Sequence, residues 1–399
     1  MARVPGSIFR KTLFWAHLCC GVAAGILIFV MSATGVLIAY QGQIVAARAD
    51  ANRVTLPAGA VPLSADQLIG KARAVAPQGG QLNLVFDADP ARPVTVTAGR
   101  QQWLLDPLSG EQLPDAAAGT RGFFRSVEDV HRWLGGDPNS TQANLMDVAN
   151  LLFLFIIASG IYLWLPQVWK WSVVRALTLF RPRYVNGKAR DFAWHHVFSV
   201  WMFIPLFLIA MSGVVMSYPW ANSLLFKAFG ETAPQPPQRG PGAGGPGGNG
   251  PGAEATPAQL ATAQQLLDAA RATFSNWQRI TLPATSRGGS ITLTADLKSD
   301  ELRTPRQALT LSTADASVVH LAPPNPGPGS TQTPGQKARS WIRFVHTGEQ
   351  FGAVGQALAA LASLAACFLA YTGLALAWRR LIVPLYRRSA DMAGHTGLT

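Results

Sequence analysis

Four long apolar segments limit what this chain can fold into. They cover residues 13–40, 145–165, 192–218 and 353–378 of the 399-residue sequence. Each is long enough to cross the roughly 30 Å hydrocarbon core of a bilayer as a helix. With 49% hydrophobic and only 14% charged residues, the chain is also too apolar for an ordinary soluble domain. We therefore predict a membrane protein that is mainly α-helical, with four transmembrane helices.

Lysine and arginine gather in three of the segments that flank these spans, at residues 1–12, 166–191 and 379–399. The positive-inside rule predicts that these three segments are cytoplasmic, so both termini face the cytoplasm. Residues 41–144 and 219–352 then lie outside, in the periplasm of a bacterial inner-membrane protein. The net charge of +12 is explained by this topology and does not indicate nucleic-acid binding.

The two halves of the chain repeat one pattern. The first span opens with the letters FWAH, ending at His17, and the third with FAWH, ending at His195. Gly35 and Gly213 follow these histidines at the same interval. We interpret the chain as internally duplicated, each half having a span, an outside domain, a histidine-bearing segment and a second span. Sites in such membrane proteins tend to form between the repeats.

Each outside segment has the pattern of a small extracytoplasmic α+β domain. Helices are predicted at residues 64–76 and 257–274, and each is followed by short runs of alternating apolar residues. These runs predict strands at residues 82–86, 94–98, 102–105, 278–282, 290–294 and 307–311. Residues 233–256 are dominated by glycine and proline, which predicts a tether and not a phosphate-binding loop.

Four of the seven histidines lie at the ends of the apolar segments, in two matched pairs. His17 and His195 lie near the cytoplasmic starts of spans one and three, whereas His131 and His346 precede spans two and four on the outer side. Ionisable side chains at a membrane span are costly and usually functional, and neutral imidazole is a common ligand for iron. The pairs predict two bis-histidine haem sites. The sequence has no Cys-x-x-Cys-His motif, so each haem would be b-type.

Further polar residues extend these sites. His196 points about 100° away from His195 on a helix, and we interpret it as a residue supporting the haem or its propionates. Arg132 and Arg343 are the predicted propionate partners at the outer pair. The predicted inner propionate partners are Arg10, Lys11 and Arg190. Two alternatives stay open, namely histidines that only hydrogen-bond between packed helices and basic residues that only anchor the helix ends.

Several short motifs together resemble one known family. They read VHRWL at 130–134, SGIYLWLP at 159–166, MSYPWAN at 216–222 and VHTGE at 345–349. In their order and topology the chain resembles the PepSY-associated transmembrane helix family, and its outside units resemble PepSY modules. Members of the family usually have asparagine after the third-span histidine, whereas this chain has His196, so the ligand can be either of two neighbours.

The resemblance implies a function. Members of the family resemble ferric-siderophore reductases and iron-regulated membrane proteins, which implies di-haem electron transfer across the bacterial inner membrane. A ferric siderophore or other ferric complex outside would be reduced by electrons from a cytoplasmic donor, such as a flavin reductase, or from a quinol. Two other functions remain open: peptide binding or peptidase regulation by the PepSY modules, and an accessory role in siderophore or metal uptake.

The outer pair requires a break in the last helical segment. His346 lies 33 residues before Arg379, which is about 50 Å along a continuous helix. That length would place His346 at or beyond the membrane surface. We therefore predict a break near Gly348 or Gly352 that folds His346 back toward the bundle and turns its imidazole toward His131.

Overall fold

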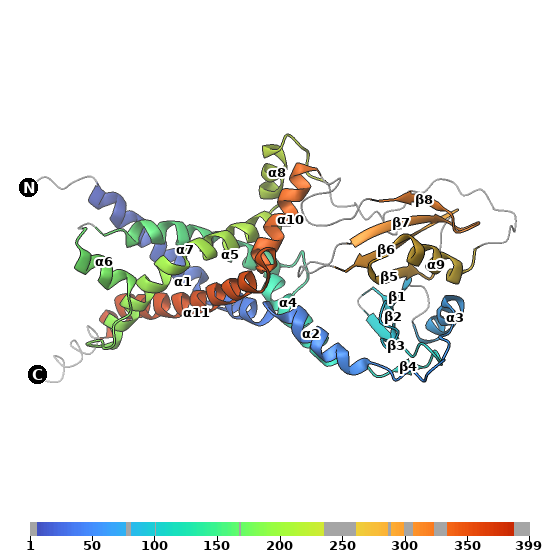
Figure 1. Cartoon of the computed structure of the whole chain (residues 1–399). Helices are drawn as coiled ribbons and strands as arrows, with labels where there is room; N and C mark the ends of the chain where they lie inside the picture. The colour runs from blue at the N-terminus through green and yellow to red at the C-terminus, as the bar shows by residue number, and fades with distance from the viewer. Residues whose placement is uncertain are drawn as a thin grey trace, which may run out of the picture. The chain divides into compact units, whose positions relative to one another are not determined.

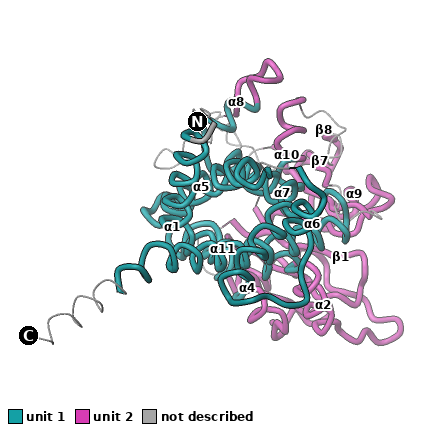
Figure 2. The backbone as a smooth tube through the Cα atoms, turned by 90° about the vertical axis from the view of Figure 1, so that its left-hand side faces the viewer, with its two compact units in different colours: residues 1–41, 122–225, 342–399 teal, residues 42–121, 226–341 magenta. Residues whose placement is uncertain are grey.

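The chain folds into two compact units, shown in teal and magenta in Figure 2. Unit 1 consists of residues 1–41, 122–225 and 342–399, and unit 2 of residues 42–121 and 226–341. The computed structural model describes residues 6–76, 81–99, 101–166, 169–234, 261–285, 289–298, 306–322 and 333–386. Most of the predicted tether, the start of the predicted helix at 257–274 and the end of the predicted C-terminal tail lie outside these residues.

Unit 1 contains the four predicted membrane-spanning helices, which are α1 (Gly6–Ile38), α5 (Thr141–Trp164), α7 (Gly187–Ser217) and α11 (Gly352–Leu381). Their most apolar windows have mean hydropathies of 1.9 to 2.4, so all four are long and apolar enough to cross a membrane. α1 packs against α5 and α11, and α7 packs against the same two helices (Figure 1). The result is a four-helix bundle with α1 and α7 at opposite corners.

Small side chains hold this bundle together. Ala24 of α1, Ala149 of α5, Ala210 of α7 and Ala362 of α11 are all buried in one apolar cluster, with Phe153 filling the space between them. Lipid tails are as apolar as leucine, so helices in a membrane associate through close backbone packing, which small residues allow.

Shorter helices flank the spans in the chain. They are α4 (Ala118–Trp133), α6 (Trp171–Thr178), α8 (Pro219–Ala228) and α10 (Pro334–Thr347). The predicted break before the last span is confirmed, because α10 ends at Thr347 and a 3-10 turn (Glu349–Phe351) separates it from α11. Gly348 has a φ of +78°, and a Cβ there would lie 2.4 Å from the carbonyl oxygen of Gly355. This turn therefore requires glycine.

Unit 2 is built on one antiparallel sheet of eight strands, in the order β4-β3-β2-β1-β5-β6-β7-β8. The strands are β1 (Leu82–Asp87), β2 (Val94–Ala98), β3 (Gln101–Leu105), β4 (Gln112–Leu113), β5 (Trp277–Pro283), β6 (Ser290–Leu297), β7 (Arg306–Ser312) and β8 (Val318–Leu321). The first four come from one half of the chain and the last four from the other. They meet where β1 pairs with β5, with Leu84 opposite Leu282. The two predicted α+β segments thus share one sheet.

Two helices cover the core of this sheet. α3 (Ala65–Val75) and α9 (Ala263–Thr273) each begin with a capping box, at Ser64 and Thr262. The backbone N–H groups at the start of α9 donate to Asp66 of α3, and Gln264 accepts a bond from the backbone of Ala65. Fully buried leucines of both helices and both sets of strands form one core. The remaining short elements before α3 are α2 (Gln41–Ala49) and a 3-10 turn (Asp50–Asn52).

Candidate functional site

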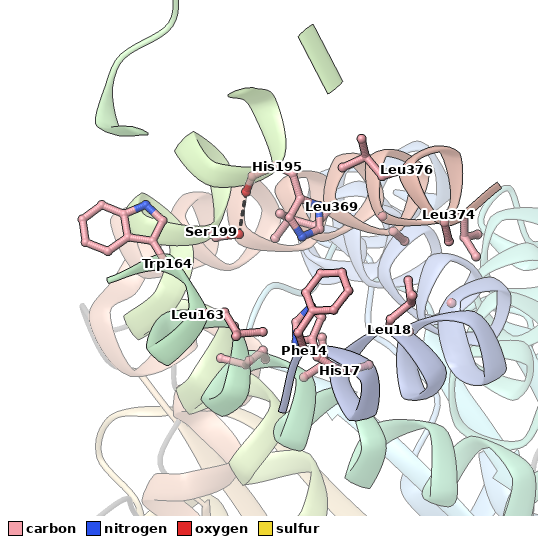
Figure 3. A pocket seen from close by; sticks show the side chains of 18 of the residues that line it. Phe14, His17, Leu18, Leu163, Trp164, His195, Ser199, Leu369, Leu374 and Leu376 are labelled. Carbon is pink, nitrogen blue, oxygen red and sulfur yellow. Dashed lines mark hydrogen bonds between the residues drawn. The ribbon is translucent and has the colours of Figure 1, made fainter. Parts of the chain in front are cut away.

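The inner histidines line a large cavity at the end of the bundle where α1 and α7 begin. The cavity has a volume of about 1040 Å³. His17 of α1 and His195 of α7 project into it, with Phe14 between them in the view of Figure 3. The volume lies at the upper end of the roughly 300–1,000 Å³ of typical ligand pockets. The two histidines therefore share a space that can hold a large flat group.

Each inner imidazole is held by a hydroxyl on a neighbouring helix. The Nδ1 atom of His17 lies 2.9 Å from Ser159 Oγ of α5. The Nδ1 atom of His195 lies 2.9 Å from Thr372 Oγ1 of α11. Each histidine from one corner of the bundle is thus held by a residue from an adjacent corner, which ties ring orientation to helix packing.

The hydroxyls at these contacts already donate to their own helices. Ser159 Oγ donates to the carbonyl of Ile156, and Thr372 Oγ1 donates to the carbonyls of Phe368 and Leu369. A hydroxyl has one proton, so its oxygen accepts the proton of the imidazole Nδ1. Nδ1 is then protonated and Nε2 carries the free lone pair, which is the tautomer that binds a metal through Nε2.

The outer histidines follow the same scheme. The Nδ1 atom of His131, on α4, lies 3.0 Å from Thr34 Oγ1 and 2.9 Å from the carbonyl oxygen of Met31. The Nδ1 atom of His346, on α10, lies 2.9 Å from Ser212 Oγ and 3.1 Å from the carbonyl oxygen of Ile209. Carbonyls only accept hydrogen bonds, so they also require a protonated Nδ1 and leave Nε2 free.

The outer rings are close together. The ring centres of His131 and His346 are 6.4 Å apart and their planes differ by 67°. Two imidazoles that bind one metal ion through bonds of about 2.0 Å can have ring centres at a spacing of this order. The outer rings are therefore close enough together to share a metal ion.

Burial keeps the outer imidazoles neutral. Burial, reinforced by the nearby His346, lowers the pKa of His131 to about 4. Burial also lowers the pKa of His346. Neutral imidazole is the form that binds metal, so both outer rings are ready to bind at neutral pH.

The two pairs lie at two levels of the same bundle. α1 carries His17 in its first half and the outer hydroxyl residue Thr34 near its end, and α7 carries His195 and Ser212 at the same interval. From the helical rise, the two levels are roughly 25 Å apart along these helices. α1 and α7 therefore each provide a histidine to one level and a hydroxyl to the other.

A glycine follows every one of the four hydroxyl residues. A Cβ on Gly160 would lie 3.3 Å from Cε1 of His17, and one on Gly373 would lie 3.4 Å from Cε1 of His195. A Cβ on Gly35 would lie 3.5 Å from Cε1 of His131. These glycines let the rings lie flat against the neighbouring helix.

The other predicted site residues divide into two groups. His196 lines the inner cavity and its Nδ1 donates to the carbonyl of Phe192 at 2.9 Å, so its Nε2 also has a free lone pair. Arg132 and Arg343 are exposed beside the outer pair, over the rings of Trp133 and Phe344.

Basic side chains also line the inner cavity, namely Arg10, Lys11, Lys188 and Arg380. Arg10 donates to the carbonyls of Leu163 and Leu165 at the end of α5. Arg190, the third predicted inner partner, instead bonds to the carboxylate of Asp191. Lys11, Lys188 and Arg380 are therefore the basic groups best placed to meet acidic groups of a ligand in this cavity.

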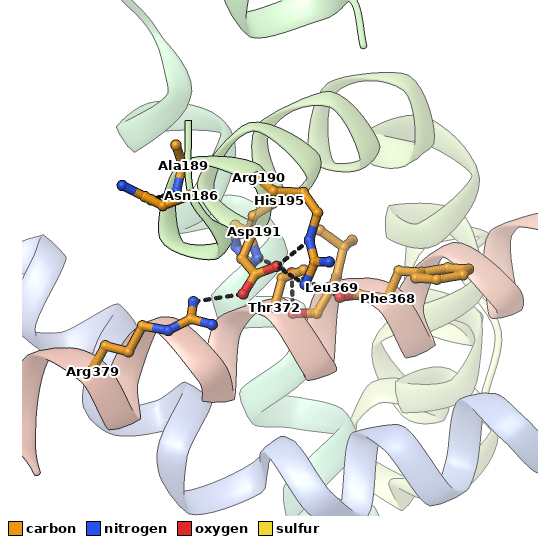
Figure 4. Close-up of polar contacts among 9 residues, drawn as sticks. All are labelled: Asn186, Ala189, Arg190, Asp191, His195, Phe368, Leu369, Thr372 and Arg379. Carbon is orange, nitrogen blue, oxygen red and sulfur yellow. Dashed lines mark hydrogen bonds and ion pairs between the residues drawn. The ribbon is translucent and has the colours of Figure 1, made fainter. Parts of the chain in front are cut away.

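An ion cluster fixes α7 against α11 near the inner pair (Figure 4). Asp191 is 0% exposed, and its two carboxylate oxygens accept from Arg190 and from Arg379, the latter at 2.5 Å. Asp191 lies one helical turn before His195, and Arg379 lies two turns after Thr372. The cluster therefore fixes the register of the two helices that bring His195 and Thr372 together.

These features fit a haem at each level. The inner pair has a large cavity, two free Nε2 atoms and basic side chains for the carboxylates, and the outer pair has two free Nε2 atoms on rings whose centres are 6.4 Å apart. Within the residues described, no group of three or more His, Cys, Asp or Glu side chains could hold a metal ion.

Sequence reasoning missed the four hydroxyls and the Asp191 cluster as parts of the site. A signal for the hydroxyls is present, because each span contains one serine or threonine directly before a glycine, and three of these glycines face a histidine ring. The pairs are Thr34-Gly35, Ser159-Gly160, Ser212-Gly213 and Thr372-Gly373. The repeat of this dipeptide at equivalent positions would have marked them.

The fold and site define a class, namely membrane proteins with a four-helix bundle, paired histidines at two levels and an α+β unit. The family model described as the PepSY-associated TM region matches residues 14–380, which is most of the chain. The chain therefore belongs to this family, as its motifs predicted. No curated protein sequence matches it.

Proposed function

We propose that this protein is an electron-transfer protein of the bacterial inner membrane that holds two haem b groups and reduces a ferric complex, such as a ferric siderophore, on the outer side. One observation carries the proposal. Four histidines, in two pairs about 25 Å apart, all have Nδ1 bonded to a hydroxyl that is itself committed to its helix. The repeated arrangement leaves Nε2 available for a metal ion at all four histidines, which supports the proposal.

In this proposal the inner haem is held by His17 and His195 and the outer one by His131 and His346. Bound haem supplies one-electron exchange between Fe(III) and Fe(II). Two imidazoles on one iron leave no open position, which favours electron transfer over oxygen chemistry. The chain's hydroxyls fix ring orientation, and orienting partners of this kind typically change metal affinity about 10–100-fold.

Basic residues would bind the haem carboxylates. Lys11, Lys188 and Arg380 line the inner cavity, and Arg380 lies 4.6 Å from the ring centre of Phe14, which holds it at the cavity wall. Arg132 and Arg343 would do the same at the outer pair. Guanidinium groups suit carboxylates because of their fork of donors.

The charge distribution in the sequence supports an orientation of the bundle in the membrane, and with it the proposed direction of electron flow. The loop before α7 and the segment after α11 are basic, which supports a cytoplasmic location for the inner pair. A flavin reductase or a quinol would then supply the electrons at that end. One electron converts the iron of an outer ferric complex to Fe(II), which hard oxygen ligands hold less tightly, so reduction releases it.

The test is an absorption spectrum of the purified full chain, oxidised and reduced with dithionite, with a haem-to-protein ratio. Two haems per chain and a sharp reduced b-type band would support both pairs. One haem per chain would overturn the second site. A colourless protein from cells that supply haem would overturn the redox function and favour a peptide-binding role for unit 2.

A further inference from the structure

A second groove in unit 1 lies beside the inner site, on another face of α7. It has a volume of about 470 Å³ and is formed by the loop after α6, by α7 and by α11. Its walls include Phe180, Arg181, Arg190, Trp194, Phe198 and Phe368. None of these six residues lines the inner cavity. The groove is therefore a separate place where a ligand can bind.

The floor of the groove is aromatic. The rings of Phe198 and Phe368 are stacked, with centres 5.1 Å apart and planes 8° from parallel. Phe180 packs edge-on against Phe198 at 5.3 Å, and Trp194 packs edge-on against Phe368 at 6.1 Å. Phe180 is 52% exposed and Phe368 36% exposed, so the protein itself leaves much of this apolar surface uncovered.

The rim of the groove is positive. Arg181 is exposed, and the guanidinium of Arg190 lies 5.3 Å from the ring centre of Trp194. Arg190 shares the carboxylate of Asp191 with Arg379, so one negative charge faces two positive ones. The sequence from Pro166 to Arg190 contains six basic residues and no acidic one. The rim therefore favours a negatively charged group.

Exposed tryptophans mark this region as a membrane interface. Trp169 and Trp171, at the start of α6, are 68% and 76% exposed. Trp201 of α7 donates to the carbonyl of Thr178 at 2.8 Å, which fastens the end of α6 to the span. Tryptophans at the ends of apolar helices lie at headgroup level in a bilayer.

We propose that this groove binds an anionic phospholipid, with its phosphate against Arg181 and the start of one acyl chain over Phe198 and Phe368. Charge complementarity selects a negative headgroup, and the aromatic floor requires an apolar part beside it. A free phosphate ion would match only the rim. This inference does not depend on haem binding.

Brominated lipids can test the proposal through quenching of tryptophan fluorescence. The full chain in mixed micelles would be titrated with phosphatidylglycerol or phosphatidylcholine, each brominated on the acyl chain. The chain has 12 tryptophans, of which Trp194 lines the groove. The difference in quenching between the unsubstituted chain and Trp194→Phe therefore gives the signal of the groove. We expect phosphatidylglycerol to bind about fivefold more strongly than phosphatidylcholine, which is the effect of one arginine, Arg181, at the rim. Arg181→Gln should remove most of that preference.

Arg183→Gln is the matched control, because Arg183 is an exposed arginine two residues away that does not line the groove. It should keep the preference. Equal quenching by both lipids in the unsubstituted chain, an equal loss in both arginine variants, or displacement by millimolar inorganic phosphate would each overturn the proposal. If Arg181→Gln does not fold, retention of phosphatidylglycerol over phosphatidylcholine by the unsubstituted chain in native mass spectrometry decides the question.

Discussion

The inner and outer histidine pairs share one hydrogen-bond scheme but differ in the space around them. The inner rings project into a cavity of about 1040 Å³. The outer ring centres are 6.4 Å apart. The inner pair thus differs from the outer pair in having a large cavity beside its rings, whereas the outer pair is distinguished by two rings in close contact.

The largest expected effect is the loss of one haem when one histidine of a pair is replaced. His195→Ala should remove the inner haem and His346→Ala the outer one, because a single imidazole is left at each level. The ratio of haem to protein should fall from about two to about one in each variant.

The exposed histidine His320 of β8 provides the control, and His320→Ala should keep both haems. Loss of both haems in each single variant would mean that the two levels are not separate sites.

A second substitution should affect the inner level alone. Asp191→Asn removes the buried charge that faces Arg190 and Arg379, and because the two arginines are 42% and 33% exposed, the loss should stay below the roughly 3–5 kcal/mol of a wholly buried ion pair. Thermal unfolding in detergent should show this loss, and the inner haem should be released before the outer one.

Asp296→Asn is the matched control, because Asp296 pairs with Arg306, which is 62% exposed. Surface pairs contribute only about 0–1 kcal/mol. Equal destabilisation by the two variants would contradict a special role for the buried cluster.

Acid should weaken the outer level of the haem-free protein. His131 has a pKa of about 4 in the folded state and about 6.5 when unfolded, so the unfolded chain binds its proton first as pH falls. The stability is fully present above pH 6.5 and is lost as pH falls to about 4. The loss should reach at most about 3 kcal/mol.

Chemical unfolding of the unsubstituted chain and of His131→Asn between pH 7 and pH 4 measures this effect. The variant should have the flatter pH dependence. Identical slopes would show that His131 titrates equally in the folded and unfolded states.

The smallest expected effects come from substituting the hydroxyl residues that hold the imidazoles. Thr372→Val leaves His195 without its hydroxyl and should weaken inner haem binding about 10–100-fold. Ser212→Ala should weaken outer haem binding to a similar extent, because the carbonyls of Leu369 and Ile209 remain as partners of His195 and His346. Titration with haem, followed by visible absorption, gives both affinities.

Thr12→Val serves as a control on α1, where the hydroxyl of Thr12 donates to the carbonyl of Ile8. It should leave both affinities unchanged. Unchanged haem affinities in both Thr372→Val and Ser212→Ala would contradict an orienting role for the hydroxyls.

The spans and the break at Gly348 were predictable because both follow from helix geometry. Hydropathy marks the length of a span, and the fixed rise of a helix implied that His346 needed a turn before the last span. The hydroxyl partners were not predicted, because Ser159 and Thr372 are 142 and 177 residues from their histidines. Serine and threonine also occur in membrane helices for reasons of packing alone.

The pairing of β1 with β5 was not predictable for a different reason. Alternating apolar residues specify which face of a strand is buried but not which strand lies beside it. Leu84 and Leu282 therefore have the right pattern for several neighbours. The similar order of helices and strands in the two halves agrees with the predicted duplication, which stays a prediction.

The shared sheet also has a consequence for biosynthesis. Its central pair joins β1 to β5, strands from opposite halves of the chain, and the membrane helices α5 and α7 are made between them. The edge of β1 that pairs with β5 therefore stays unpaired until α5, α7 and β5 have been synthesised. Such long-range pairing is slow, and open edges aggregate. Nascent chains halted after α7 should therefore be protease-sensitive in residues 42–121 and in need of a chaperone.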